Sequence, residues 1–149
     1  MGLKGKLIGQ VEISFHGDLY HDIIGARPHH LPSMTSGVHA VDGQWGTVGY
    51  TTIFKYTQDG KTEIAEKVID AIDDEKKMVK YRVTKGDPLK SYKSFILTCQ
   101  VDSNGDDHFV SWTIDYEKLK EEIPEPLTYL DFLLKMTKEM EDHHAKLKP

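Results

Sequence analysis

The chain has 149 residues, and its 24 acidic side chains outnumber its 19 basic ones, for a formal net charge of −5 at pH 7. Acidic and basic residues are interspersed without a basic run, so nothing supports binding to a phosphate backbone, and we expect no nucleic-acid partner. A single cysteine, Cys99, excludes an intramolecular disulfide. This length predicts one domain, residues 1–149, with one hydrophobic core.

The first ten residues, MGLKGKLIGQ, carry no recognisable targeting signal. They lack the apolar core of a signal peptide, and Lys6 stands where a myristoylation signal needs Ser or Thr. No later stretch approaches the roughly 20 apolar residues of a membrane-spanning helix. We therefore expect a cytoplasmic protein without a membrane span.

Residues 3–15 alternate with a period of two, which predicts a β-strand. One face of this strand would carry Leu7, Gly9, Val11, Ile13 and Phe15. Asp18 then offers an N-cap for a short helix over 19–24. The segment between Pro28 and Pro32 predicts an irregular stretch or a second short helix.

The middle of the chain predicts strands joined by tight turns. The glycine-rich DGQWGTVG at 42–49 predicts a turn loop, because glycine adopts backbone angles that other residues avoid. It lacks the Lys-Ser/Thr ending of a phosphate-binding loop. Asp59-Gly60 and Asn104-Gly105 are typical of hairpins. The predicted strands run from 38 to this loop and over 50–56, 61–73, 78–84, 95–101 and 108–117.

The segment 61–73 has two interpretations. Its composition is compatible with a helix, whereas the turns on both sides favour a strand. As a strand it would present Ala65, Lys67, Ile69 and Ala71 on one face, with Ile72 on the other. We adopt the strand.

The last segment changes to helical spacing. Pro124 and Pro126 predict the start of a helix that runs to about Ala145. Thr128 and Asp131 have the spacing of a capping pair. The periodic positions are Leu130, Leu133, Leu134, Thr137, Met140 and Glu141.

These elements predict an α+β fold in which a curved antiparallel sheet is covered by one long C-terminal helix. Such a helix leaves space where it does not fill the concave face. The inward side chains are large and apolar, with a few phenol and indole groups, which is typical of a small-molecule pocket. The alternative is an ordinary packed core.

Several segments together resemble the plant major latex protein family, within the birch pollen allergen and pathogenesis-related class 10 superfamily. The resemblance rests on GLKGKLIGQVEI, RPHHLPSM, DGQWGTVGY, FKYTQDGKTE, VIDAIDDEKKMVKYRVTKGD, SWTIDYEKL and PEPLTYLDFLLKMTKEME, in this order. It implies the helix-grip fold, a seven-stranded curved antiparallel sheet around a long C-terminal helix with two short helices after strand 1.

The resemblance also implies a function. It is that of a carrier or binding protein for a hydrophobic metabolite of plant specialised metabolism or defence, such as a terpenoid, alkaloid, lipid or flavonoid. The alternative is a cofactor-independent cyclase or isomerase that steers a reactive iridoid or alkaloid intermediate. We expect no cofactor and no metal, since adjacent histidines such as His143 and His144 point about 100° apart on a helix. We expect a monomer or weak homodimer.

Carried over by strand parity, the resemblance implies a set of cavity-facing positions. They are Ile23, His29, Leu31, Phe54, Tyr56, Lys67, Tyr81, Val83, Leu97, Cys99, Trp112, Leu133 and Met136. It also implies an acidic residue where this chain has Lys67.

Lys67, His29, Tyr56 and Tyr81 are the candidate proton-transfer groups. An inward Lys67 would have a lowered pKa and act as a base or form a Schiff base. The favoured interpretation, however, is a strand register shifted by one residue or a side chain that reaches the rim. Equally, His29 would lie on a surface loop, and the two tyrosines would be core aromatics with satisfied hydroxyls.

Overall fold

The computed structural model describes residues 3–14 and 17–147, so the predicted inward position of Phe15 lies outside the described residues. Its strands are β1 (Lys4–Ile13), β2 (Val38–Gly43), β3 (Thr51–Gln58), β4 (Lys61–Asp73), β5 (Met78–Gly86), β6 (Tyr92–Asn104) and β7 (Asp107–Lys118). Its helices are α1 (Gly17–Ala26), α2 (Leu31–Met34) and α3 (Leu127–Leu147), with 3-10 turns η1 (Pro28–His30) and η2 (Asp87–Lys90).

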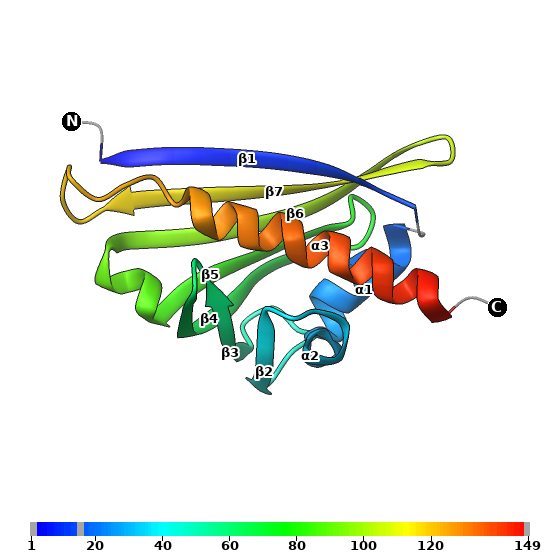
Figure 1. The fold of residues 1–149 in the computed structure, drawn as a ribbon, viewed down its shortest axis with the longest axis horizontal. Helices are drawn as coiled ribbons and strands as arrows, with labels where there is room; N and C mark the ends of the chain where they lie inside the picture. Colours follow the sequence, from blue (N-terminus) through cyan, green and yellow to red (C-terminus); the bar gives the residue numbers. More distant parts are fainter. Residues whose placement is uncertain (1–2, 15–16, 148–149) are drawn as a thin grey trace.

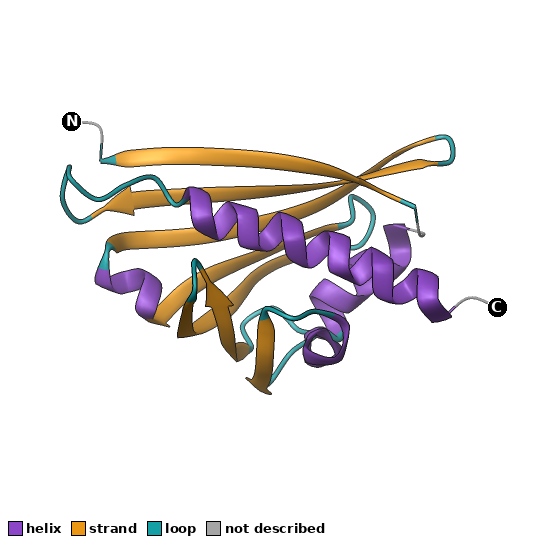
Figure 2. Ribbon diagram, in the orientation of Figure 1, coloured by secondary structure: helices purple, strands orange, loops and turns teal. Residues whose placement is uncertain are grey.

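The seven strands form one antiparallel sheet in the order β1-β7-β6-β5-β4-β3-β2 (Figure 2). Strands β2 to β7 therefore pair with their neighbours in sequence, and β1 joins the free edge of β7. Helix α3 crosses one face of this sheet, and α1 and α2 lie at one end of it, close to the C-terminal half of α3 (Figure 1). This arrangement confirms the predicted α+β helix-grip fold with short helices after the first strand.

Alternating burial along the strands explains why only one face is covered. In β7, Val110, Trp112, Ile114 and Tyr116 are buried, whereas the residues between them are partly exposed. An antiparallel sheet with one such apolar face needs a single covering layer. The face that the sequence predicted for 3–15 is likewise the more buried face of β1.

Gly9 allows α3 to pack closely against β1. A Cβ atom at this position would lie 2.9 Å from Leu134 Cδ1 and 3.2 Å from Leu130 Cδ1, both on α3. A larger residue would push the helix away from the edge of the sheet, since a glycine in a strand often marks close approach of another element.

The predicted turns are present. Asp59 and Gly60 have φ angles of 51° and 71°, and they join β3 to β4. Gly105 has a φ of 65° between β6 and β7. In the glycine-rich loop after β2, the glycines at both ends have positive φ, 98° for Gly43 and 93° for Gly49, as the turn-loop prediction requires.

Two local predictions are wrong. Thr128 lies inside α3 rather than at its N-cap, and its hydroxyl donates to Gln58 Oε1 at 2.8 Å. In β4, a bulge between Ile69 and Ala71 shifts the register, so that Ile72 pairs with the buried Val79 and shares its face. The bulge reverses the alternation that was extrapolated from the first half of the strand.

Candidate functional site

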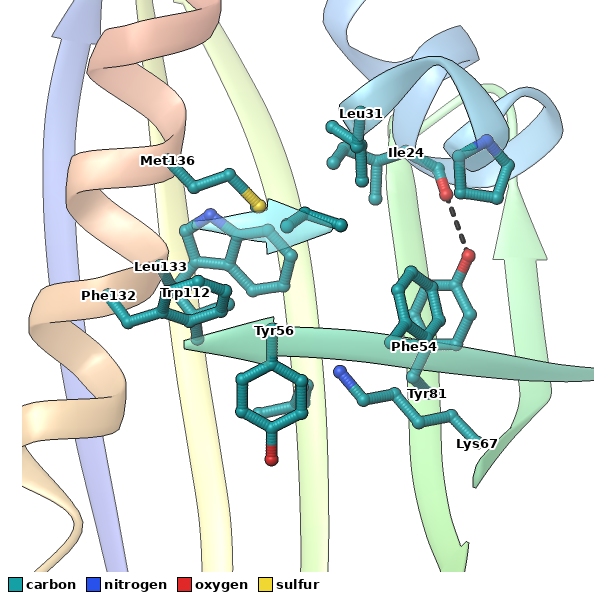
Figure 3. Close-up of a pocket in the computed structure, with 13 residues that line it drawn as sticks. Ile24, Leu31, Phe54, Tyr56, Lys67, Tyr81, Trp112, Phe132, Leu133 and Met136 are labelled. Atoms are coloured by element: carbon teal, nitrogen blue, oxygen red, sulfur yellow. Dashed lines mark hydrogen bonds between the residues drawn. The ribbon is translucent and has the colours of Figure 1, made fainter. Parts of the chain in front are cut away.

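A pocket lies between the inner face of the sheet, α3 and the short helices (Figure 3). Side chains from six neighbouring strands, β2 to β7, from α3 and from the short helices after β1 enclose it. The lining residues are Ile24, Pro28, Leu31, Val38, Phe54, Tyr56, Lys67, Tyr81, Leu97, Trp112, Phe132, Leu133 and Met136. Nearly all of these side chains are apolar or aromatic, as in most small-molecule sites.

Nine of the thirteen positions predicted to face a cavity line this pocket. They are Leu31, Phe54, Tyr56, Lys67, Tyr81, Leu97, Trp112, Leu133 and Met136. Eight of them, all but Leu31, come from long strands or from α3, where side-chain direction follows directly from the period of the element.

The other four positions lie elsewhere. Val83 and Cys99 are buried in the core without lining the pocket, and burial raises the pKa of the Cys99 thiol. Ile23 is buried and borders a hollow between α1, α2 and the C-terminal end of α3, because the adjacent Ile24 points into the pocket. Neighbouring side chains on a helix point about 100° apart, so an error of one position in the sequence places the wrong side chain in the pocket.

His29 is exposed, and its predicted place in the cavity is wrong. Its ring stacks on Trp45 with centroids 4.4 Å apart, and partial desolvation together with His30 and Arg27 lowers its pKa. Pro28 turns inward in its place. The surface alternative for this residue is therefore the correct one.

Four lining residues were not on the predicted list: Ile24, Pro28, Val38 and Phe132. Phe132 stands four residues before Met136 on α3, so helical spacing offered a signal that could have found it. Ile24 and Pro28 lie in short helical turns, where the sequence contains too few periods to define a face.

The pocket is narrow. The space open to the centres of water molecules is ≈ 30 Å³, whereas pockets that hold drug-sized ligands measure roughly 300–1,000 Å³. This space corresponds to about two waters. Any larger guest must therefore displace lining side chains, among which Met136 is the most adaptable because its chain is unbranched.

Among the described residues, Lys67 is the one charged residue that lines the pocket, and it is 6% exposed. Its Nζ donates a hydrogen bond to Tyr129 Oη at 3.0 Å and lies 4.5 Å from the centroid of the Phe54 ring. Burial lowers the pKa of Lys67 to about 7, because the charged form loses hydration. The register-shift and rim interpretations are both wrong, since the amine points into the molecule (Figure 3).

Two phenols complete a polar group around this amine, which we call the open cluster: Lys67, Tyr56 and Tyr129. The Tyr56 ring lies 5.7 Å from Nζ and 5.5 Å from the Tyr129 ring. Burial raises the pKa of both phenols. Tyr56 Oη is buried without a hydrogen-bond partner among the described residues, so this cluster contains an unused donor.

A second polar group, the closed cluster of Tyr20, Trp112 and Thr137, lies behind the pocket. Trp112 Nε1 donates to Tyr20 Oη and to Thr137 Oγ1, each at 3.1 Å, and the two hydroxyls are 2.8 Å apart. Thr137 also donates to the Leu133 carbonyl at 2.9 Å. All three side chains are buried and satisfy one another, which is typical of a structural network.

Tyr81 lines the pocket with its ring, whereas its hydroxyl is already engaged. Tyr81 Oη donates to the Ile24 carbonyl at 2.7 Å and thereby holds α1 against β5 (Figure 3). Its pKa is raised, chiefly by burial. The hydroxyl therefore serves as a structural tie, and a proton donor for a guest is better sought in the open cluster.

Within residues 3–14 and 17–147, no cluster of three or more His, Cys, Asp or Glu side chains is arranged to hold a metal ion. Over the same residues, no helix combines the length and the apolar character that crossing a membrane requires.

Comparison with known proteins places this fold and pocket in a family. Residues 2–146 match the model of the pathogenesis-related protein Bet v 1 family. MLP-like protein 31 from Arabidopsis thaliana is 36% identical over 95% of this chain and 86% of its own length. MLP-like protein 28 from the same plant is 37% identical, and the chain spans 44% of that longer relative.

Among solved structures, ginseng major latex-like protein 151 from Panax ginseng superimposes with a TM-score of 0.93. The two chains are 43% identical over 96% of this chain and 99% of the ginseng chain. The family model and the ginseng structure thus each cover nearly the whole chain. The chain therefore belongs to the pathogenesis-related protein Bet v 1 family, among its major latex protein-like members.

Proposed function

We propose that this protein binds one small hydrophobic molecule, a plant specialised metabolite, in the pocket between the sheet and α3. The observation that carries the proposal is the pocket itself: an apolar, aromatic lining that contains a buried amine and an unpartnered phenol, Lys67 and Tyr56. A core evolved only for packing would gain stability by replacing such groups with apolar ones. The proposal includes a monomer or weak homodimer that acts in the cytoplasm in specialised metabolism or defence.

Because the free volume of the pocket is small, ligand binding requires side chains to move. A guest enters only if side chains such as Met136 and the half-buried Phe132 move. Binding therefore costs part of the native packing and gains the burial of the guest's apolar surface, at about 25 cal/mol per Å². We expect micromolar affinities.

The two tryptophans offer a local test, because Trp112 lines the pocket and Trp45 does not. In the variant Trp45→Phe, all tryptophan emission comes from the pocket. We expect a saturable change in this emission on titration with a panel of terpenoids, flavonoids and sterols.

The matched control is Trp112→Phe, in which only the half-buried Trp45, outside the pocket, reports. Its emission is expected to stay constant over the same titration. Equal changes in both variants, or no saturable change with any compound, would refute binding in this pocket.

A second candidate is a cofactor-independent cyclase or isomerase, which one contact favours. Lys67 Nζ and Tyr129 Oη, 3.0 Å apart beside a mostly apolar pocket, form a base and acid pair suited to moving a proton on a bound guest. The Tyr56 ring lies 5.7 Å from the same amine, whereas His29 is too exposed to take part.

Catalysis is tested by the product ratio of a spontaneous cyclisation, measured with and without the protein across reactive iridoid and alkaloid intermediates. A changed stereochemical outcome that disappears in Lys67→Met supports an enzyme. An unchanged rate and product ratio leaves binding as the function.

A further inference from the structure

We propose that the open cluster is an anion subsite, and that the natural guest is an apolar carboxylic acid whose carboxylate pairs with Lys67. This inference rests on the proposed function and adds the chemical class of the ligand. It assigns Lys67, with the Tyr129 hydroxyl beside it, to the head group, and the apolar lining to the hydrocarbon body.

The first argument is the missing counter-ion. No acidic side chain of the described residues lies within 4.0 Å of Lys67 Nζ, which has only the Tyr129 hydroxyl as hydrogen-bond partner. The other buried lysine, Lys118, shows the usual solution, since its Nζ lies 2.8 Å from Glu125 Oε1. A buried ammonium ion without a partner is costly, and a bound anion would remove that cost.

The second argument is an excess of donors. An ammonium group carries three N–H donors and no acceptor, and each phenol adds one O–H. One ammonium donor is used on Tyr129, and Tyr56 Oη has no partner among the described residues. A carboxylate, which only accepts, matches this inventory better than an alcohol or an amine.

The third argument is the position of the amine. Lys67 comes from the middle of β4 and extends toward the ring of Phe54, while Leu31, Trp112 and Met136 form the opposite side of the pocket (Figure 3). A guest seated there would place its charged end at Lys67 and its apolar body against α3. This polarity suits an acid with one head group at the end of a hydrocarbon.

The charge state of the site follows from the groups around the amine. Tyr56 of β3, Tyr81 of β5 and Tyr129 of α3 all have raised pKa values, so they remain neutral donors through the physiological range. Glu63 of β4 acts on the two phenols of the open cluster from outside the pocket. Lys67, with its pKa lowered to about 7 by burial, is therefore the group whose charge changes near neutrality.

The experiment compares decanoic acid with decanamide by titration calorimetry at pH 6.5. The two compounds share the hydrocarbon chain and the carbonyl, and only the acid is charged. We expect decanoate to bind about 10- to 100-fold more tightly, the range of a hydrogen bond to a charged group. Lys67→Met should lower the affinity for decanoate to that for decanamide, whereas the surface control Lys55→Met should leave both unchanged.

The pH dependence of the unmodified protein gives an independent measurement. Decanoate should bind about tenfold more weakly at pH 8.5 than at pH 6.5, because one proton on Lys67 is linked to binding. Decanamide should show no such change. Equal affinities for the two compounds would overturn the anion subsite while leaving hydrophobic binding intact, and failure of both to bind would overturn both proposals.

Discussion

The two buried polar clusters differ in how completely their hydrogen bonds are used. In the closed cluster, Tyr20, Trp112 and Thr137 exchange three contacts of 2.8–3.1 Å and need nothing further. In the open cluster, Lys67 has a single hydrogen bond and the Tyr56 hydroxyl has none among the described residues. Both clusters lie under the same helix, and Trp112 and Lys67 line the same pocket.

We infer from this difference that the closed cluster stabilises the fold, whereas the open cluster is available to bind a ligand. A satisfied buried network stabilises one conformation, whereas an unsatisfied one costs free energy until a ligand completes it. We therefore expect mutations in the closed cluster to destabilise the protein, and apolar mutations in the open cluster to stabilise it. The following changes test this contrast in order of decreasing effect.

Trp112→Ala should have the largest effect. It removes a fully enclosed indole and leaves Tyr20 and Thr137 without their shared donor, so the free energy of unfolding should fall by about 3–5 kcal/mol. Urea denaturation measures the loss, with Trp45→Ala, at a half-buried position of the glycine-rich loop, as the control. A loss below about 1 kcal/mol would show that this site relaxes and that the cluster is not structural.

Lys67→Met should stabilise the protein by about 1–4 kcal/mol at pH 6, since an apolar chain of similar length replaces a buried charge. Lys67 has a pKa of about 7 in the folded protein against an ordinary 10.5 when unfolded. The unfolded state therefore binds more protons between these values, and the unmodified protein gains stability as the pH rises from 7 toward 10.5.

The advantage of Lys67→Met over the unmodified protein should accordingly shrink from pH 6 to pH 9. Paired denaturation curves at the two pH values measure this change. A stability difference that stays constant with pH, or a destabilised variant, would mean that the amine is already compensated within the folded chain.

Two tyrosine-to-phenylalanine changes form the smallest and most closely matched test. Tyr20→Phe removes a hydroxyl that bonds to Trp112 and Thr137 and should cost about 1–2 kcal/mol. Tyr56→Phe removes an unpartnered hydroxyl and should be neutral or slightly stabilising. Thermal unfolding of the two variants side by side distinguishes them, and equal losses would contradict the difference between the clusters.

The sequence predicted well wherever an element was long. The alternation through Ala65, Lys67 and Ile69 correctly gave the inner face of β4, and the spacing of Leu133, Met136 and Met140 gave the covered face of α3. It failed in the short helical turns, where Ile24 and Pro28 replaced Ile23 and His29, and at the bulge that turned Ile72 inward. A hydrophobic period must repeat several times before it predicts which way the side chains point. A β-bulge interrupts this alternation, and the sequence gives no reliable signal of where it does so.

The sequence by itself determined the helix-grip fold, because period-two strands, glycine turns and one terminal amphipathic segment allow few other arrangements. Only the tertiary structure decided that Lys67 is buried without a counter-ion among the described residues. That outcome depends on which side chains of β3, β4 and α3 meet in space, since Tyr129 lies 62 residues after Lys67 along the chain. The burial of a side chain and the identity of its polar partners depend on these tertiary contacts, so a local sequence pattern does not predict them.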